Sequence, residues 1–428
     1  MVLAPDDVSV RPRVIFAWLL AVGLTLAPSL ARADVVVTWM NIADQVVVRP
    51  DENNSRLRTP PNTRSNAQVA LAMFEAVNAV EGRYRSYLGT PPAPAGTSAE
   101  AAAAAAAHAV LATLFPDRKK LFDDALTVSL ARVADGPGKT AGVDLGKRTA
   151  AAAMARAALP AGTAYAHYRP RTVAGEYIDP GLPSILPFDL LLPPFFLARA
   201  DELRPAGPPA LASKQYARDL EEVKRLGGKA STERPADKTL LARAWLRINY
   251  SAIVADVARL PGRSLSQNAR MYALCEMASE DTWLAVKEAK LQFRRWRPIT
   301  AIRNADQDGN DDTARDEAWE PLLRTPPHPE YPCGHCGYSA TVAAVLEAET
   351  GPAPAGGVTL RSYEDNPGMA ITMPTWKAFV DEMSVSRIYA GAHVRSANEA
   401  GEAIGREVAR RALAGFMQLK SGRPSRPK

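Results

Sequence analysis

The sequence has no strong excess of charge of either sign, no internal repeat and, after residue 30, no long apolar run. The net charge of +6 over 428 residues is too small to indicate a nucleic-acid-binding protein, so no nucleic-acid partner is expected. A membrane-spanning helix needs about eighteen consecutive apolar residues, and no segment after residue 30 offers them. The composition, 47% hydrophobic and 23% charged, also excludes collagen, coiled-coil and wholly disordered proteins.

The first 33 residues have the features of a secretory signal peptide. Arg11 and Arg13 precede an uncharged run from Val14 to Leu30, and the small-residue sequence Ala31-Arg32-Ala33 follows it. A basic region, an apolar region and an A-x-A site are the three parts of a cleavable signal peptide, whereas an uncleaved membrane anchor is the alternative. We therefore expect residues 1–33 to be removed and the mature protein to be exported, either periplasmic or secreted, without a membrane span.

Most of the remaining chain shows the apolar spacing of helices, and no segment predicts a sheet. Helices are expected over residues 66–84, 119–133, 139–157, 213–226, 237–260, 264–293, 341–349, 374–383 and 398–413, with a further alanine-rich helix ending near Leu114. Thr97 with Glu100, and Ser264 with Gln267, are spaced as capping boxes. Residues 34–48 fit either a strand or a helix. The proline-rich residues 169–210 are expected to pack as irregular coil over the helices.

The last third of the chain combines three histidines with three cations, namely His328, His335, His393, Lys290, Arg297 and Arg387. Lys290 and Arg297 are seven residues apart, which places them on one face if the helix continues to Pro298, where it should end. Converging cations suit a tetrahedral oxyanion, because guanidinium and ammonium N–H groups match its oxygens. The loop Pro332-Cys333-Gly334-His335 leads into a helix whose first N–H groups would complete an anion-binding site.

These residues form three linked motifs. Lys290-x6-Arg297-Pro298, Pro332-Cys333-Gly334-His335 and Ser386-Arg387-x5-His393 together resemble the signature of the superfamily of vanadium haloperoxidases and type 2 phosphatidic acid phosphatases. The flanking residues 296–303 and 328–332 resemble its secreted bacterial haloperoxidase-like branch. The resemblance implies an all-α fold, a helical bundle of the acid phosphatase/vanadium haloperoxidase type. We expect an N-terminal helical region, 34–263, and a catalytic region, 264–428, packed on it as one body.

The resemblance also implies a role for each site residue. His393 would be the apical ligand of vanadium, or the nucleophile of a phosphatase, and His335 would be the general acid and base. The equatorial oxygens would be held by Lys290, Arg297, Arg387, the Gly334 amide and the side chain at position 333. His328 stands where bromide-using members have a second histidine.

Two positions depart from the family pattern. Cys333 replaces a serine whose hydroxyl binds an equatorial oxygen, so a thiol stands in its place. Ala397 stands where many phosphatases carry an acidic residue that orients the nucleophilic histidine, and Glu399 is off register. The first departure threatens oxyanion binding, while the second disfavours phosphatase chemistry in particular.

The resemblance implies a secreted vanadate-dependent haloperoxidase, which oxidises a halide with hydrogen peroxide. Vanadate is then the cofactor, and hydrogen peroxide and halide are the small-molecule partners. The first alternative is a soluble acid phosphatase that acts on a phosphomonoester through a phosphohistidine and needs no cofactor. The second alternative is a catalytically impaired homologue that binds oxyanions.

Other polar residues have simpler interpretations. Cys333-Gly334-His335-Cys336 has the residue types of a dithiol oxidoreductase, but no buried strand precedes it, so that class is disfavoured while a disulfide remains open. Residues 304–316 resemble a calcium loop, but Arg315 stands where the bidentate acid belongs, which favours a solvated acidic turn. Cys275 is expected to be a buried free thiol, His108 and His167 to be structural, and Arg294 and Arg295 to lie at the surface.

Overall fold

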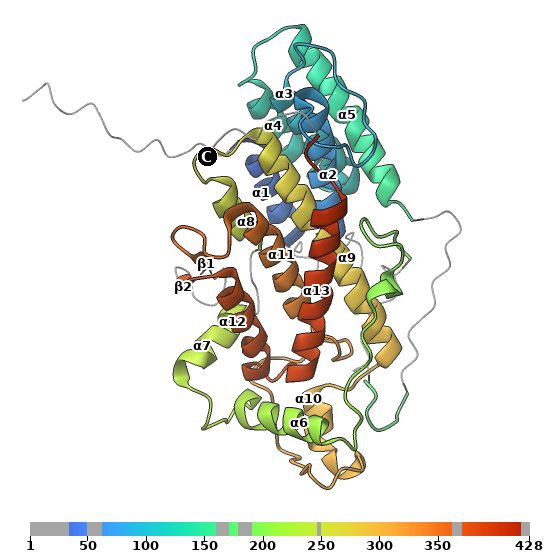
Figure 1. Ribbon diagram of the computed structural model, residues 1–428, viewed down its shortest axis with the longest axis vertical. Helices are drawn as coiled ribbons and strands as arrows, with labels where there is room; N and C mark the ends of the chain where they lie inside the picture. Colours follow the sequence, from blue (N-terminus) through green and yellow to red (C-terminus); the bar gives the residue numbers. More distant parts are fainter. Residues whose placement is uncertain are drawn as a thin grey trace, which may run out of the picture. The chain divides into compact units, whose positions relative to one another are not determined.

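The computed structural model describes residues 34–48, 62–159, 171–178, 191–245, 250–361 and 370–420, and within these ranges the chain is mostly helical (Figure 1). The predicted signal peptide and His167 lie outside the described residues. The all-α prediction is confirmed. None of the described helices is both long and apolar enough to cross a membrane.

The helices of the first half are α1 (Val35–Val48), α2 (Asn62–Glu81), α3 (Ala99–Leu114), α4 (Lys119–Leu130), α5 (Pro137–Ala157), α6 (Lys214–Gly227), α7 (Ala236–Ala244) and α8 (Tyr250–Ala258). Those of the second half are α9 (Leu265–Phe293), α10 (Pro298–Arg303), α11 (Gly334–Thr350), α12 (Trp376–Tyr389) and α13 (Arg395–Gly415). The described residues also form the short 3-10 turns η1 (Pro116–Arg118), η2 (Ala200–Leu203) and η4 (Ala305–Gln307).

Helix α9 is the central element, and it contacts α2, α11 and α13 (Figure 1). Residues 271–282 are buried without interruption, because neighbouring helices cover α9 on every face. The predicted capping box is confirmed: Ser264 Oγ accepts the N–H of Gln267, and Gln267 Oε1 accepts the N–H of Ser264. The long helix therefore starts at a defined residue and delivers its last turn, which holds Lys290, to the candidate site.

The described parts of the proline-rich segment are irregular, as predicted, apart from the short turn η2. Asp281 of α9 binds this segment, since its carboxylate accepts the main-chain N–H groups of Phe195, Phe196 and Leu197 at 2.6–3.1 Å. Burial raises the pKa of Asp281 to about 7, with these three N–H groups acting in the opposite direction. The Asp281 carboxylate thus supplies the hydrogen-bond acceptors that regular secondary structure would otherwise give these N–H groups.

Helices α11 and α13 cross at very short range, which brings two of the sequence motifs together. A Cβ atom on Gly401 would lie 2.1 Å from the carbonyl oxygen of Cys333, and one on Gly405 would lie 2.1 Å from that of Gly337. Cys333 N–H also donates to the Ala397 carbonyl at 2.9 Å. Only glycine permits this approach, so these two positions set the distance between the helix after Cys333 and the helix after His393.

Several local predictions need correction. The cap of α3 is Ser98, whose Oγ accepts the N–H of Ala101, because Thr97 Oγ1 is already bonded to the Pro94 carbonyl. The helix expected over residues 237–260 is two helices, α7 and α8. Helix α11 begins at Gly334 rather than at residue 341, because Cys333 caps it. A small antiparallel pair, β1 (Val358–Arg361) and β2 (Ala370–Met373), was not predicted. Residues 34–48, left open, form α1.

Candidate functional site

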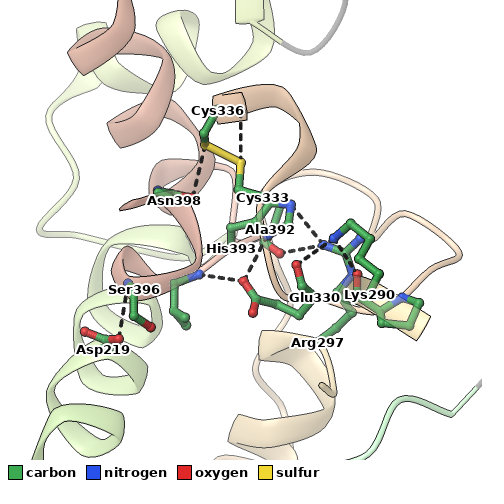
Figure 2. A network of polar contacts seen from close by, with 12 residues as sticks. Asp219, Lys290, Arg297, Glu330, Cys333, Cys336, Ala392, His393, Ser396 and Asn398 are labelled. Atoms are coloured by element: carbon green, nitrogen blue, oxygen red, sulfur yellow. Dashed lines mark hydrogen bonds and ion pairs between the residues drawn. A yellow bond between two sulfur atoms is a disulfide. The ribbon is translucent and has the colours of Figure 1, made fainter. Parts of the chain in front are cut away.

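Four loops and helix ends bring together a subset of the predicted site residues, among which Figure 2 labels Lys290, Arg297 and His393. Lys290 lies in the last turn of α9, and Arg297 precedes α10. His328 lies in the segment before α11, and His393 lies between α12 and α13. Lys290, Arg297 and His393 are each exposed by 3% or less.

Lys290 and Arg297 converge by a different route from the one predicted. Helix α9 ends at Phe293, because Arg294 adopts a left-handed conformation with φ of 49°. Arg297 then has extended backbone, and Pro298 starts α10 instead of ending α9. The two cations therefore do not share one helical face; a turn between two helices aims them at the same place.

Arg297 is held by four neighbouring acceptors. Its Nε donates to the His328 carbonyl at 2.7 Å, and Nη1 donates to the Ala392 carbonyl at 2.9 Å. Nη1 also lies 3.3 Å from His393 Nε2, and Nη2 lies 2.8 Å from His328 Nδ1. Because a guanidinium can only donate, His393 Nε2 carries a lone pair toward Arg297. His328 Nδ1 has the Arg297 donor on one side and the Pro329 carbonyl, at 3.2 Å, as a second neighbour.

Lys290 is bonded to the same loop. Its Nζ donates to the carbonyls of Pro329 and Glu330 at 2.7 and 2.8 Å. An ammonium group has three donors, so the two carbonyls leave one N–H for another acceptor.

His393 is paired with a carboxylate that was not among the predicted site residues. Glu330 Oε1 lies 2.9 Å from His393 Nδ1, and it also accepts the N–H of Val394 at 3.1 Å (Figure 2). The two side chains are exposed by only 3% and 2%. Nothing in the sequence spacing indicates this pair, since 63 residues separate its members. The one available signal was a carboxylate inside an otherwise apolar, proline-flanked stretch.

The start of α11 carries the second motif. Cys333 and Cys336 form a disulfide, which resolves the question that the sequence left open. Cys333 Sγ accepts the N–H of Cys336 at 3.2 Å and so acts as the helix cap. Gly334 is the first helical residue, where a main-chain N–H has no acceptor within the helix. A Cβ atom on Gly334 would lie 2.3 Å from the ring of Trp283, so glycine is required there.

Arg387 and His335 complete the predicted set. The Arg387 guanidinium donates to Ser386 Oγ at 3.1 Å and to the Ala242 carbonyl at 3.4 Å, and the side chain is buried. Its own carbonyl accepts the N–H of His393 at 3.3 Å, which links α12 to the loop that carries the histidine. His335 is half-buried in the first turn of α11, and its charge contributes to lowering the pKa of both His328 and His393.

The buried charges of the site are mostly positive. Burial lowers the pKa of Lys290 well below its ordinary value and those of Arg297 and Arg387 to about 10. Burial, followed by Arg297 and Lys290, holds the pKa of His393 well below its usual range, so the imidazole is neutral at neutral pH. Burial raises the pKa of Glu330 to about 7, against the attraction of Lys290 and Arg297. Buried cations in excess of buried carboxylates favour an anion as the ligand.

This set of donors fits a tetrahedral oxyanion such as vanadate or phosphate. His393 Nε2 presents a lone pair, Lys290 has a donor to spare, and the Gly334 amide lies at a helix N-terminus. One donor of the pattern that the sequence resembles is missing: a disulfide sulfur carries no hydrogen, so Cys333 cannot donate to an oxygen of the anion. The site is therefore suited to bind an oxyanion with one contact fewer than the family pattern.

The structure also places the histidine, cysteine, acidic and arginine residues that the sequence did not assign to the site. His108 pairs with Asp123 at 2.8 Å and lies edge-on to Trp39, and Cys275 is a buried free thiol, as predicted. In the acidic turn, Asp308 accepts the N–H of Asn310 and the hydroxyl of Thr313. Arg294 and Arg295 are both half-buried, and Arg295 lies over the ring of Tyr216, so the prediction that these two residues lie at the surface was wrong.

Comparison with known proteins finds a family match over the part of the chain that holds the candidate site. Residues 270–422, which contain every predicted site residue, match a family model described as VCPO second helical-bundle domain. A bacterial vanadium-dependent iodoperoxidase has a similar structure, with a TM-score of 0.72 and 20% identity over 91% of this chain and 97% of that chain. The holo form of a bacterial vanadium-dependent chloroperoxidase matches with a TM-score of 0.66 and 16% identity, over 90% of this chain and 93% of that chain. No curated protein matches the sequence. At these identities the structural likeness establishes the fold.

Proposed function

We propose that the chain is a vanadate-dependent haloperoxidase of the superfamily of vanadium haloperoxidases and type 2 phosphatidic acid phosphatases, supported by the family model that matches residues 270–422 and by the similar fold. The observation that carries the proposal is the buried His393, whose Nε2 lone pair faces Arg297 beside Lys290. The bacterial proteins of similar fold are vanadium-dependent iodo- and chloroperoxidases. Hydrogen peroxide and a halide are the proposed substrates.

Each site residue has a physical task in this proposal. His393 Nε2 would bind the metal, while Lys290, Arg297, Arg387 and the Gly334 amide would hold the oxygens around it. When bound, vanadate supplies Lewis-acid activation of hydrogen peroxide, without a change in its oxidation state. His335 would move the proton, since an imidazole titrates near neutral pH.

Arg297 must change partners when the oxyanion binds. Its Nη1 lies 3.3 Å from His393 Nε2, the atom that would bind vanadium. A lone pair cannot accept from an N–H and bind a metal at once, so Arg297 has to release this nitrogen. The released N–H group would then be available to an oxygen of the bound anion.

A phosphomonoesterase is the second candidate, and the structure strengthens it. The sequence argument against phosphatase chemistry was the absence of an orienting acid at Ala397. Glu330 contacts His393 Nδ1 at 2.9 Å and can take that place. In this reaction His393 Nε2 would attack phosphorus and His335 would protonate the leaving oxygen, with no cofactor. An impaired oxyanion-binding homologue is the third candidate, favoured by the disulfide at Cys333.

Export from the cytoplasm is part of the proposal. Residues 1–33 have the pattern of a signal peptide, and a disulfide between Cys333 and Cys336 fits an oxidising compartment. A protein that works in the periplasm or outside the cell would keep this disulfide formed.

One purified sample tests the candidates against each other. The vanadate-free protein is assayed with a phosphomonoester, and the vanadate-loaded protein is assayed with bromide and hydrogen peroxide, each beside His393→Ala. Bromide oxidation that the variant lacks supports the haloperoxidase, and phosphate release that the variant lacks supports the phosphatase. Vanadate binding without either activity supports the impaired homologue. If His393→Ala keeps a tenth of the wild-type rate, the site assignment is wrong.

A further inference from the structure

In α13, the position where many phosphatases carry the acid that orients the histidine is occupied by Ala397, and this residue packs through its main chain. Ala397 is fully buried, and its carbonyl accepts the N–H of Cys333 at 2.9 Å. Gly401, one turn later, packs its Cα against the Cys333 carbonyl. The first turn of α13 therefore brings the two motifs together, and Ala397 offers no polar side-chain atom to His393.

Glu330 reaches His393 from the segment before α11, and its own position is fixed at both main-chain groups. Its N–H donates to the Arg295 carbonyl at 2.9 Å, and its carbonyl accepts from Lys290 Nζ at 2.8 Å. Its side chain bridges His393 Nδ1 and the N–H of Val394. The carboxylate is thus held between the α9–α10 turn and the start of α13.

The hydrogen bonds on the two sides of the ring define its tautomer. Arg297 can only donate, so His393 Nε2 is unprotonated, and Nδ1 carries the hydrogen that points to Glu330 Oε1. This is the tautomer that a metal ligand or a nucleophile needs, because the reacting nitrogen keeps its lone pair.

We propose that Glu330 is the positioning residue of His393, a carboxylate supplied by the loop before α11 in place of an acid in α13. It holds Nδ1–H, fixes the ring plane and leaves Nε2 directed at the oxyanion site. The effect of Glu330 on the binding of vanadate or a phosphoryl group rests on the proposed function. Its effect on the tautomer of His393 does not.

The burial of Glu330 makes a purely structural role unfavourable. Its Oε2 atom has no hydrogen-bond partner among the described residues, and a buried, half-satisfied carboxylate is destabilising. Glu330 lines a small cavity of about 20 Å³ with Trp296 and Ser396, which is room for about one water molecule. A role in packing alone gives no reason for a carboxyl group at this position, whereas the contact of Oε1 with His393 Nδ1 does.

Nitrogen-15 NMR of the vanadate-free protein tests the proposal directly. We expect His393 to be a single tautomer, protonated at Nδ1, in the wild type; in Glu330→Ala the share of the other tautomer should rise, although Arg297 still favours an unprotonated Nε2. Glu330→Gln keeps an acceptor without the charge, so it should raise that share less. Asp219→Asn is the matched control, because Asp219 is a buried acid at the same cavity that binds the Ser396 N–H instead of the histidine. It should leave the ring signals unchanged.

Vanadate titration of the same proteins measures the consequence. Glu330→Ala should weaken binding roughly 10–100-fold, as the loss of an outer partner of a metal ligand does, and Glu330→Gln should weaken it less. Glu330→Ala combined with Ala397→Asp should recover part of the loss if the acid can act from α13.

The two measurements separate the inference from the proposed function. A wild type that binds no vanadate, but whose His393 tautomer changes in Glu330→Ala, contradicts the haloperoxidase while supporting the positioning role. Unchanged ring signals and unchanged affinity in both Glu330 variants would overturn the positioning role. Should Glu330→Ala fail to fold, Glu330→Gln gives both readouts alone.

Discussion

At the scale of single residues, the site is defined by buried cations that lack equal buried negative charge. Lys290, Arg297 and Arg387 are each 2% exposed or less, and their ordinary partners are carbonyls, a hydroxyl and imidazoles. Neutral acceptors compensate burial less well than an anion does. Binding of an oxyanion should therefore be strong, and each cation should contribute measurably.

Removing one of these cations should weaken the binding of vanadate. Replacement of Lys290, Arg297 or Arg387 by Ala is expected to cost roughly 2–4 kcal/mol of binding free energy, because a buried charge-assisted contact is lost. Isothermal titration with vanadate measures it. Arg294→Ala is the matched control, since Arg294 Nε donates to the Leu291 carbonyl at the end of its own helix. Equal losses at Arg294 and Arg297 would indicate a diffuse basic surface instead of a defined site.

At the scale of elements, the candidate site depends on the contact between α11 and α13. Gly401 and Gly405 let the two helices approach, and Cys333 N–H binds the Ala397 carbonyl across the contact. Cys336 Sγ also lies 3.3 Å from Asn398 Oδ1, and Asn398 Nδ2 donates to the Ser384 carbonyl of α12. The second and third motifs are thus one packed unit.

A methyl group at this contact should separate the two motifs. Gly401→Ala is expected to destabilise the protein by about 3 kcal/mol or more, because its Cβ would overlap the Cys333 carbonyl, which is main chain and cannot rotate away. Gly415→Ala, in the same helix with no atom within 4 Å of the added Cβ, should be neutral or slightly stabilising. Thermal unfolding of both variants checks this, and an equal effect at the two positions would contradict it.

The disulfide at the start of α11 should limit oxyanion affinity. In Cys333→Ser a hydroxyl can still cap the helix and could also donate to an oxygen of the bound anion, which a disulfide sulfur cannot. We expect tighter vanadate binding in Cys333→Ser than in the wild type. Cys336→Ser is the control, because it also opens the disulfide but leaves sulfur at position 333. If both variants gain equally, the effect comes from opening the disulfide; if neither gains, sulfur is a native part of the site.

At the scale of the whole molecule, the central helix α9 carries acidic side chains that are buried in the core between the helices. Glu276 of α9 is 3% exposed, and its Oε2 has no partner among the described residues. Burial raises the pKa of Glu276 to about 8, and Asp44 adds to the effect. An acid whose pKa is raised by folding stabilises the folded state while protonated, so stability falls as the pH rises from the unfolded value near 4.5 toward 8.

Glu276→Gln should make stability less dependent on pH. The unfolding free energy of the wild type is expected to fall between about pH 5 and about pH 8, by up to about 1.4 kcal/mol per pH unit for this group. The neutral variant should lose the part of the slope that belongs to Glu276, while Asp281 and Glu330, whose pKa values are also raised, to about 7, keep theirs below about pH 7. Denaturant unfolding at several pH values measures it. The exposed Glu317→Gln should leave the slope unchanged, and a Glu276→Gln profile as steep as the wild type would contradict the prediction.

The sequence by itself determined the features that depend on short spacing. Apolar periodicity located most helices, the capping box at Ser264 placed the start of α9, and three motifs identified His393, Lys290, Arg297 and Arg387. Each of these signals is contained within a few turns of chain, where helix geometry and side-chain chemistry act locally.

Only the tertiary structure decided the contacts between distant segments. Glu330 and His393 are 63 residues apart, and their pairing follows from how α9, α11 and α13 pack. The same packing closes the Cys333–Cys336 disulfide against α13 and turns the chain at Arg294, so that Arg297 meets Lys290 from another helix. Hydrogen bonds and close approaches of this kind depend on non-local packing, which periodicity and motif spacing do not encode.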